Sequence, residues 1–284
     1  MKLTLLGTGT SQGVPTIGCR CEVCQSSDKH DKRLRTSAMV EVGDCRIVID
    51  AGPDFRYQML RANVKKLDAI LITHEHMDHI KGIQKFARTY NTKVYAHINI
   101  SEIVKSQIHI DNSQFIFFND CFEIEDLTIC PFALPHDSKY CVGYRISEED
   151  AVVSVCTDLG HMSDETFEVI KSSALIYLEA NYDPEMLMSY PNYPPFLKKR
   201  IHGKHGHMSN LDCAKTIEKL VHAGTRLVVL SHISEHSNTE NLAIGTVAGY
   251  LESKNIIPNV NVSLDIAHHE QRGTIFRIKP SSKK

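Results

Sequence analysis

The segment LITHEHMDHIKG at 71–82 restricts the possible folds of this chain most strongly. Its apolar start is followed at once by five side chains of the kinds that bind metal ions, namely His74, Glu75, His76, Asp78 and His79. A short apolar run that ends in polar residues predicts a buried strand, followed here by a turn and a helix. From such a turn His74 and His76 can converge on one cation, while Asp78 and His79 can reach a second. The pattern therefore predicts a metal centre at the end of a strand.

Other side chains of the same kinds also follow apolar runs. Asp50 closes RIVI, Asp158 follows VVSVCT, His232 follows LVVLS, and His136 lies in LPHDS. Because α/β proteins assemble their sites at the ends of buried strands, we expect these residues to complete the centre. Four isolated histidines are instead expected to be surface or hydrogen-bonded residues: His97, His109, His222 and His268.

Short β-rich runs alternate with helical patterns, which predicts an α/β fold. Strands are expected at LTLL, AMVEV, RIVID, AILIT, VYAH, LTICPFAL, AVVSVC, ALIYLEA and RLVVLSHI, and helices at 54–62, 79–90, 164–172, 209–222 and 239–253. Residues 1–284 are expected to form a single domain, because α/β domains often reach this length and no low-complexity linker is present. The Pro-rich stretch YPNYPPF at 190–196 predicts a surface loop or lid.

Composition limits the location and the partners. A chain that is 42% hydrophobic and 23% charged resembles an average soluble globular protein, and a formal charge of -2 gives no global basic field for nucleic acid or a membrane. The apolar run in MKLTLLGTGTSQG is too short for a signal-peptide core, so we expect a cytoplasmic protein without a membrane partner. Nine cysteines without a secretion signal argue against a disulfide framework. Six of them are expected to be single core residues: Cys45, Cys121, Cys130, Cys141, Cys156 and Cys213.

Taken together, the elements IDAG, THEHMDH, LPH, TD and SH resemble the motifs of the metallo-β-lactamase superfamily. The resemblance implies an αββα four-layer sandwich with two divalent ions, zinc or manganese, that share a bridging hydroxide. It assigns the ligands as follows: His74, His76 and His136 to one ion, Asp78, His79 and His232 to the other, and Asp158 to both. Asp50 is expected to orient a ligand or water rather than to bind metal. The di-iron flavoprotein branch has a glutamate in place of His76, so this ligand set favours hydrolysis over redox chemistry.

The motif GCRCEVC places Cys19, Cys21 and Cys24 at a spacing suited to a structural zinc. This opening resembles the PhnP family of cyclic phosphodiesterases, in which three cysteines and one histidine hold such a zinc. The resemblance implies a zinc loop around 18–36. The family's fourth ligand corresponds to Glu235 here, and His236, one residue further on, is the preferred candidate.

The stretches YLEANYDPEML and YPPFLKKRIHGKHGHMSN resemble a second branch, the WalJ/YycJ-like proteins, for which the resemblance implies a DNA exonuclease role. In both branches the histidine that matches His207 lies beside the metals. We expect His207 to act as a general acid or to contact a phosphate oxygen, with a residue near the cap of the following helix as the alternative. One dense basic segment precedes it, and we define the basic segment by Lys198, Lys199, Arg200, His202, Lys204 and His205.

These features predict a di-metal phosphodiesterase that hydrolyses a small cyclic or nucleotide-like phosphodiester, with His207 and Asp78 as catalytic residues. An exonuclease or another nucleic-acid-processing hydrolase is the first alternative. A tRNase Z role is weaker, since no Gly/Pro-rich arm is inserted. A non-hydrolytic metal-binding protein is the alternative of another class. Both a monomer and a homodimer are compatible with the sequence.

Overall fold

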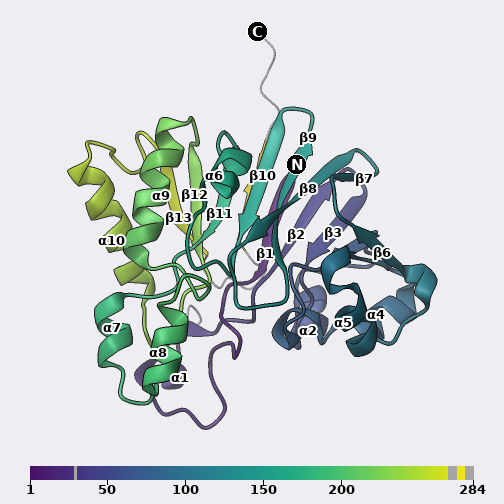
Figure 1. Ribbon diagram of the computed structural model, residues 1–284, viewed down its shortest axis with the longest axis horizontal. Helices are drawn as coiled ribbons and strands as arrows, with labels where there is room; N and C mark the ends of the chain where they lie inside the picture. The colour runs from purple at the N-terminus through teal and green to yellow at the C-terminus, as the bar shows by residue number, and fades with distance from the viewer. Residues whose placement is uncertain (29–30, 268–273, 279–284) are drawn as a thin grey trace. The chain divides into compact units, whose positions relative to one another are not determined.

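A computed structural model describes residues 1–28, 31–267 and 274–278, and Figure 1 shows its helices and strands. The chain divides into two compact units. Unit 1 contains Met1–Pro131 and Ser138–Val142 together with the described residues 274–278, and unit 2 contains Phe132–Asp137 and Gly143–Ala267. None of the described helices is long and apolar enough to cross a bilayer.

Unit 1 carries a mixed seven-stranded sheet of order β14-β1-β2-β3-β4-β5-β6. Its strands are β1 Lys2–Gly7, β2 Ser37–Val42, β3 Cys45–Ile49, β4 Ala69–Leu71, β5 Lys93–His97, β6 Phe115–Phe118 and β14 Ile275–Arg277. Strands β1 to β3 pair antiparallel, whereas β3 to β6 pair parallel. Its helices are α1 Glu22–Gln25, α2 Phe55–Arg61, α3 Met77–Ile80, α4 Ile83–Tyr90 and α5 Ser101–Gln107, with 3-10 turns at Ile98–Ile100 and Asn112–Gln114.

The core of unit 1 holds in place the strand ends that the candidate site residues follow. Val48, Ile70 and Val94 on three neighbouring strands are fully buried, and they pack with Phe55 of α2 and Ile83 of α4. Burial of apolar side chains from both layers is the main stabilising term for such a sheet. The loops after β3 and β4 therefore start from a rigid platform.

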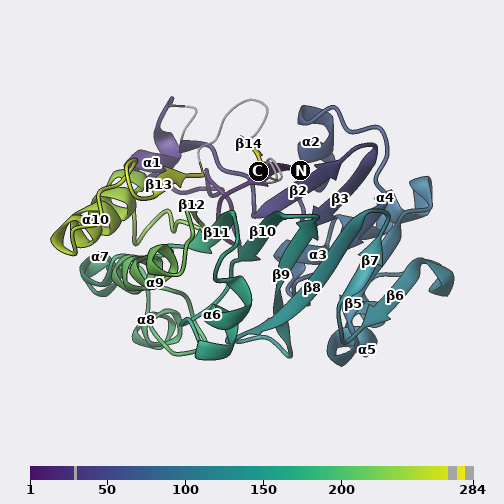
Figure 2. The same cartoon turned by 90° about the horizontal axis from the view of Figure 1, so that it is seen from above.

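The second sheet has the order β13-β12-β11-β10-β9-β8-β7, and Figure 2 shows β10, β9, β8 and β7 in succession. Its strands are β7 Phe122–Ile124, β8 Leu127–Leu134, β9 Cys141–Glu148, β10 Ala151–Cys156, β11 Leu175–Glu179, β12 Leu227–Ser231 and β13 Ser263–Ile266. Strands β10 to β13 pair parallel. The helices of unit 2 are α6 Asp164–Ile170, α7 Pro184–Ser189, α8 Pro195–Ile201, α9 Asn210–His222 and α10 Glu240–Ser253, of which α9 and α10 lie side by side (Figures 1 and 2).

The expected helix at 79–90 is wrong in one respect, because the structure has two helices separated at Lys81 and Gly82. The Gly82 N–H donates to the carbonyl oxygen of Ala51 at 2.8 Å, and a Cβ at position 82 would lie 2.3 Å from the carbonyl oxygen of Gly52. The backbone at Gly82 is therefore committed to the loop after β3. A close backbone approach of this kind interrupts the helix.

The expected loop at 190–196 is also wrong in part, because α8 begins at Pro195. Proline is favoured in the first turn of a helix, where its missing N–H has no partner to lose. The lysines and the arginine of the basic segment that follow therefore lie on a helix and in the turn after it.

The expectation of single core cysteines fails for Cys121 and Cys130, which form a disulfide. Strand β7 pairs with β8 so that Phe122 faces Ile129, and continuing this register by one residue places Cys121 opposite Cys130. Directly opposed residues of an antiparallel pair are close enough to be bridged. An odd number of cysteines therefore does not exclude a local disulfide between neighbouring strands.

Candidate functional site

In unit 1 the carboxylate of Asp50 holds the segment 73–79, which we call the histidine loop. The backbone N–H of Thr73 donates to Asp50 Oδ1 at 2.9 Å, and the Thr73 hydroxyl donates to Oδ2 at 2.7 Å. His79 Nδ1 donates to the same Oδ2 at 2.7 Å. Since the Thr73 hydroxyl hydrogen points to Asp50, its oxygen accepts from His74 Nδ1 at 2.9 Å. Asp50 thus holds the ring of His79 directly and that of His74 through Thr73.

These bonds decide which ring nitrogens carry lone pairs. With Nδ1 protonated in His74 and His79, each ring presents Nε2 as an acceptor. His74 Nε2 lies 3.0 Å from His76 Nδ1, and both rings belong to one short turn. Two imidazole nitrogens this close suit two ligands of one cation at about 2.0–2.1 Å each. The arrangement within unit 1 therefore fits a metal ion.

Helix α3 brings in the other predicted ligand of this loop. His76 is its N-cap and Asp78 lies in its first turn, where His79 Nε2 is 3.5 Å from Asp78 Oδ2. The Ala51 N–H donates to the His79 carbonyl oxygen at 2.7 Å, and a Cβ at Gly52 would lie 1.8 Å from the Asp78 carbonyl oxygen. The glycine of IDAG is needed because only a residue without a Cβ lets α3 approach this closely.

In unit 2 the carboxylate of Glu179 orients histidine rings as Asp50 does in unit 1. It is fully buried at the end of β11, and its Oε1 accepts from His207 Nδ1 at 2.7 Å and from His232 Nδ1 at 2.8 Å. Its Oε2 accepts the Leu159 N–H at 2.8 Å. Burial acts to raise the pKa of Glu179, but the charges and hydrogen bonds of the two histidines lower it well below its usual range. Glu179 therefore stays ionised and fixes the orientation of both rings through Nδ1.

Glu179 is the site residue that sequence reasoning missed. It belongs to a fully buried run, LIYLE, and no ligand spacing marks it. The sequence signal that could have identified Glu179 is its position, because it ends a strand in the same way that Asp50 follows one.

His136 and Asp158 lie together in unit 2. His136 Nδ1 donates to the Gly206 carbonyl oxygen at 3.2 Å, and its Nε2 is 3.9 Å from Asp158 Oδ1. One ligand atom from each of His136, Asp158 and His207 lies within 4.8 Å of the others, and the same holds for Glu179, His207 and His232. Burial lowers the pKa of His136, which favours the neutral ring that a metal ligand must be.

The donor set as a whole fits metal binding. Five histidines are held through Nδ1 by a carboxylate, a hydroxyl or a carbonyl oxygen: His74, His79, His136, His207 and His232. Partners of this kind orient metal-bound histidines and raise their basicity. The assignment of individual ligands to two ions stays a prediction.

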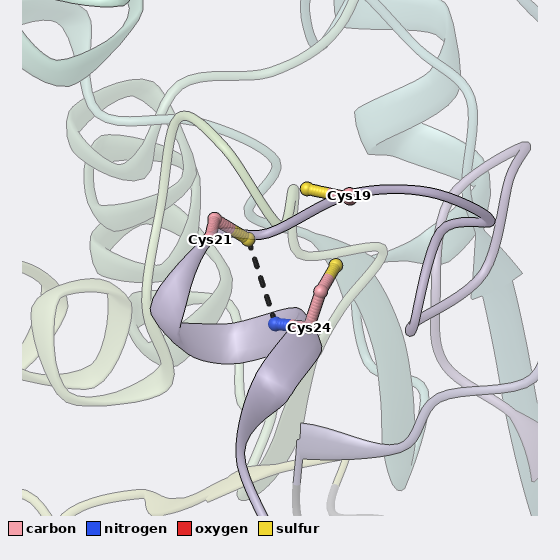
Figure 3. A group of neighbouring side chains, drawn as sticks. All are labelled: Cys19, Cys21 and Cys24. Carbon is pink, nitrogen blue, oxygen red and sulfur yellow. Dashed lines mark hydrogen bonds between the residues drawn. The ribbon is translucent and has the colours of Figure 1, made fainter.

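The cysteine motif forms a compact cluster in unit 1, with the three sulfur atoms within 4.8 Å of one another (Figure 3). Cys21 caps α1, and its Sγ accepts the Cys24 N–H at 3.5 Å; the Thr16 N–H donates to Cys24 Sγ at 3.3 Å. Amide groups that donate to sulfur stabilise the thiolates that zinc requires. Without a metal, burial raises the pKa of Cys24 to about 11.

The fourth ligand of the cysteine cluster stays a prediction, because both candidates belong to unit 2. There the His236 ring stacks on Tyr190 with centroids 4.8 Å apart, and His236 Nε2 is 3.7 Å from Glu235 Oε1. In the predicted zinc loop at 18–36, residues 29 and 30 lie outside the described part of the chain.

The isolated histidines match their expectation where they are described. His109 and His222 are exposed, and His97 is buried with Nδ1 accepting the Asn99 N–H at 3.2 Å. His268 lies outside the described residues. The cap expected near His207 is Ser209, whose hydroxyl accepts the Asp212 N–H at 3.1 Å.

Comparisons with known proteins identify relatives and solved structures that resemble this chain. The chain is 32% identical over 261 residues to an octanoyltransferase of Porphyromonas gingivalis, covering 84% of this chain but only 46% of that protein, so it spans about half the length of that relative. It is 31% identical over 229 residues to exodeoxyribonuclease YycJ of Bacillus anthracis, covering 77% of this chain and 86% of the relative. A solved diphosphatase from the PhnP family is similar with a TM-score of 0.71 and 28% identity, covering 97% of this chain and 96% of that one.

A family model described as a beta-lactamase superfamily domain matches residues 45–233, a range that contains Asp50 and the histidine loop and ends just after His232. The two mixed sheets with their helices agree with the αββα fold of this family, which confirms the expected fold class. The chain therefore belongs to the metallo-β-lactamase superfamily.

Proposed function

We propose that this protein is a metal-dependent phosphodiesterase that holds two divalent ions, zinc or manganese. The proposed ligands are His74, His76 and His136 for one ion, Asp78, His79 and His232 for the other, and Asp158 for both. Bound ions of this kind polarise a phosphoryl oxygen and lower the pKa of water towards about 7. Asp50 and Glu179 keep the ligand rings in the orientation that binding requires.

The observation that carries the proposal is the bond between His207 and Glu179. The His207 side chain is 21% exposed, whereas Glu179 is fully buried, and their 2.7 Å contact leaves His207 Nε2 as the second nitrogen of the ring. A buried carboxylate on Nδ1 holds the imidazole ring in a fixed orientation, as in other carboxylate–histidine pairs of hydrolases. His207 can therefore give the Nε2 proton to the alkoxide that leaves phosphorus while water supplies the new P–O bond.

A small phosphodiester, cyclic or nucleotide-like, is the proposed substrate. The similarity to the PhnP-family diphosphatase supports this class, and so does the cysteine cluster, because its motif resembles that of the PhnP family. The formal charge of -2 also gives no long-range attraction for a polyanion. We place the activity in the cytoplasm, in a protein that acts as a monomer or a homodimer.

Helix α8 supports a second candidate, an exonuclease. None of its residues is buried, Phe196 is 74% exposed, and Lys199 and Arg200 follow on the same helix. An exposed aromatic ring beside cations is a common platform for single-stranded nucleic acid. The similarity to exodeoxyribonuclease YycJ points the same way.

Salt dependence separates these two candidates. Three phosphate contacts from the basic segment would weaken DNA binding about 20- to 40-fold between 50 and 200 mM salt, whereas a small diester should be bound almost equally at both concentrations. The assay compares a cyclic nucleotide and bis(4-nitrophenyl) phosphate with single- and double-stranded DNA. Salt-sensitive DNA degradation without turnover of the small diesters would establish the exonuclease and refute the first candidate.

Substitution of His207 tests its role as the acid. Because a nitrophenolate scarcely needs protonation, His207→Ala should reduce turnover of an alkyl phosphodiester by about 10²–10⁴-fold and that of an aryl diester far less. The matched control is His222→Ala, which removes an exposed histidine at the end of α9. Equal losses on both substrates, or loss of metal from His207→Ala, would show that His207 is not the leaving-group acid.

A further inference from the structure

The segment 138–142 of unit 1 is hydrogen-bonded to the histidine loop. The Lys139 N–H donates to Glu75 Oε1 at 2.6 Å, and the Val142 N–H donates to the Thr73 carbonyl oxygen at 3.0 Å. Glu75 stands between His74 and His76 in the chain. The first bond is short and charge-assisted, which is the stronger class of hydrogen bond. Any displacement of this segment therefore acts on the turn that carries the proposed ligands.

A ring contact fixes the same segment from another side. The Tyr140 ring stacks on the His97 ring with centroids 4.2 Å apart and an angle of 27° between the planes. His97 ends β5 and is itself buried, so this support is rigid. Cys141 is also buried, at 3% exposure. Within the described stretch 138–142, Lys139 is exposed, whereas the other residues are buried or half-buried.

The Lys139 side chain is the exposed charge of this segment. Among the residues that the structure describes, its ammonium group makes no hydrogen bond or ion pair, although its backbone N–H is tied to Glu75. Most lysines with this freedom lie on flexible surfaces, but this one is anchored at the backbone next to two proposed metal ligands. Its backbone is thus held in place, while its charge remains available to a ligand.

The carboxylate of Glu75 is the group that holds the Lys139 backbone. Among the described residues its buried Oε2 makes no hydrogen bond, and the carboxylate is bonded through Oε1 to the Lys139 N–H. Burying a carboxylate oxygen without a partner costs stability, which an ordinary loop position would avoid. A residue that carries this cost and holds one backbone amide is a positioning residue.

We propose that Lys139 binds a non-bridging oxygen of the substrate phosphate and that Glu75 positions Lys139 for this contact. The inference rests on the proposed phosphodiesterase function. Because a phosphodiester is negatively charged before and after the attack on phosphorus, the contact is made equally in the bound state and the transition state. Loss of such uniform binding raises KM and leaves kcat unchanged.

The experiment compares zinc-loaded wild-type protein with Lys139→Ala, Lys139→Arg, Glu75→Ala and Glu75→Gln. The control is Lys85→Ala, which removes an exposed lysine from α4. Calorimetry measures the Kd of inorganic phosphate, and kinetics on bis(4-nitrophenyl) phosphate measure KM and kcat. Metal content is determined for each variant.

Lys139→Ala should raise both the Kd of phosphate and KM about 10- to 100-fold, the effect expected for a charged hydrogen bond, with kcat and metal content unchanged. Arginine should restore most of the affinity. Glu75→Ala should reproduce the Lys139→Ala result, whereas Glu75→Gln keeps an oxygen acceptor for the Lys139 N–H and should lie between Glu75→Ala and the wild type.

The outcomes separate this inference from the proposed function. Unchanged Kd and KM in Lys139→Ala, with active wild-type protein, would refute the contact and leave the phosphodiesterase intact. Wild-type protein that binds phosphate through Lys139 but hydrolyses no diester would refute the function and keep the contact. Wild-type protein that binds no phosphate would refute the contact, and loss of metal in Glu75→Ala would refute the positioning role.

Discussion

Replacing Gly52 with alanine should displace helix α3. The added Cβ would lie 1.8 Å from the Asp78 carbonyl oxygen, whereas non-bonded carbon and oxygen atoms stay roughly 3.3 Å apart. The two backbones must therefore separate by about 1.5 Å. The obstructing atom is backbone, so no side-chain rotation can relieve the clash. Such a movement also disturbs the bond from the Ala51 N–H to the His79 carbonyl oxygen.

The cost of Gly52→Ala has a structural and a chemical part. Forcing a methyl group into a packed interior costs about 1–3 kcal/mol of unfolding free energy. A misplacement of about 1 Å in a catalytic arrangement can cost on the order of 10²-fold in rate. We therefore expect a destabilised protein with reduced metal content and a loss of diester turnover of at least this order. Urea unfolding, metal analysis and kinetics on one preparation measure all three.

Gly249→Ala is the matched control for Gly52→Ala. Gly249 lies exposed in α10, and a Cβ added there would meet no atom within 4 Å. Alanine in a helix is favoured over glycine, so this variant should gain about 0.5–1 kcal/mol. If Gly52→Ala unfolded at the same urea concentration as the wild type and kept its metal and activity, the packing argument for the IDAG glycine would be refuted.

Three further predictions concern other parts of the chain. Cys21→Ser should lower the melting temperature without changing the catalytic metal content, because structural zinc contributes directly to folding; wild-type stability with loss of the catalytic metals would contradict a separate zinc site. Thiol titration of unfolded, unreduced and metal-free protein should find seven thiols, since Cys121 and Cys130 are bonded, and nine would contradict the disulfide. Burial lowers the pKa of His97, so the unfolded chain takes up the proton more readily and stability should fall as pH falls below about 6.5; His97→Gln should flatten urea unfolding profiles between pH 8 and 5, and an identical pH dependence would refute this.

The fold was predictable where local pattern and tertiary packing agree. LTICPFAL became β8 with the expected bounds, and Ser209 and Thr239 cap α9 and α10 as Ser/Thr residues before helical patterns do. Helix 79–90 failed because Gly82 is held by the loop after β3, a contact with a residue 31 positions away that no local pattern contains. Strand β14 pairs with β1 from the far end of the chain and was missed for the same reason.

The candidate site was predictable to the extent that its residues share motifs. His74, His76 and Asp78 fall at fixed spacings, whereas Glu179 stands alone in a buried strand and acquires its role only through the rings of His207 and His232. Glu75 lies in the same motif, THEHMDH, but its residue type and spacing do not indicate its role. Its partner is a backbone amide, and backbone partners leave no residue type in the sequence to recognise.

Three polar strand-end residues also carry a backbone cost. Asp50, Asp158 and His232 have φ values of 61°, 62° and 53°, in the left-handed region that residues with a Cβ avoid at a cost of about 1–2 kcal/mol. Glycine would remove the cost at each position but would also remove the side chain. At Asp50 the cost is offset by the bonds to Thr73 and His79, and at His232 by the bond to Glu179. The strained backbone at these strand ends belongs to residues of the candidate site. We infer that each turn keeps its strained conformation because that conformation directs the side chain into the site.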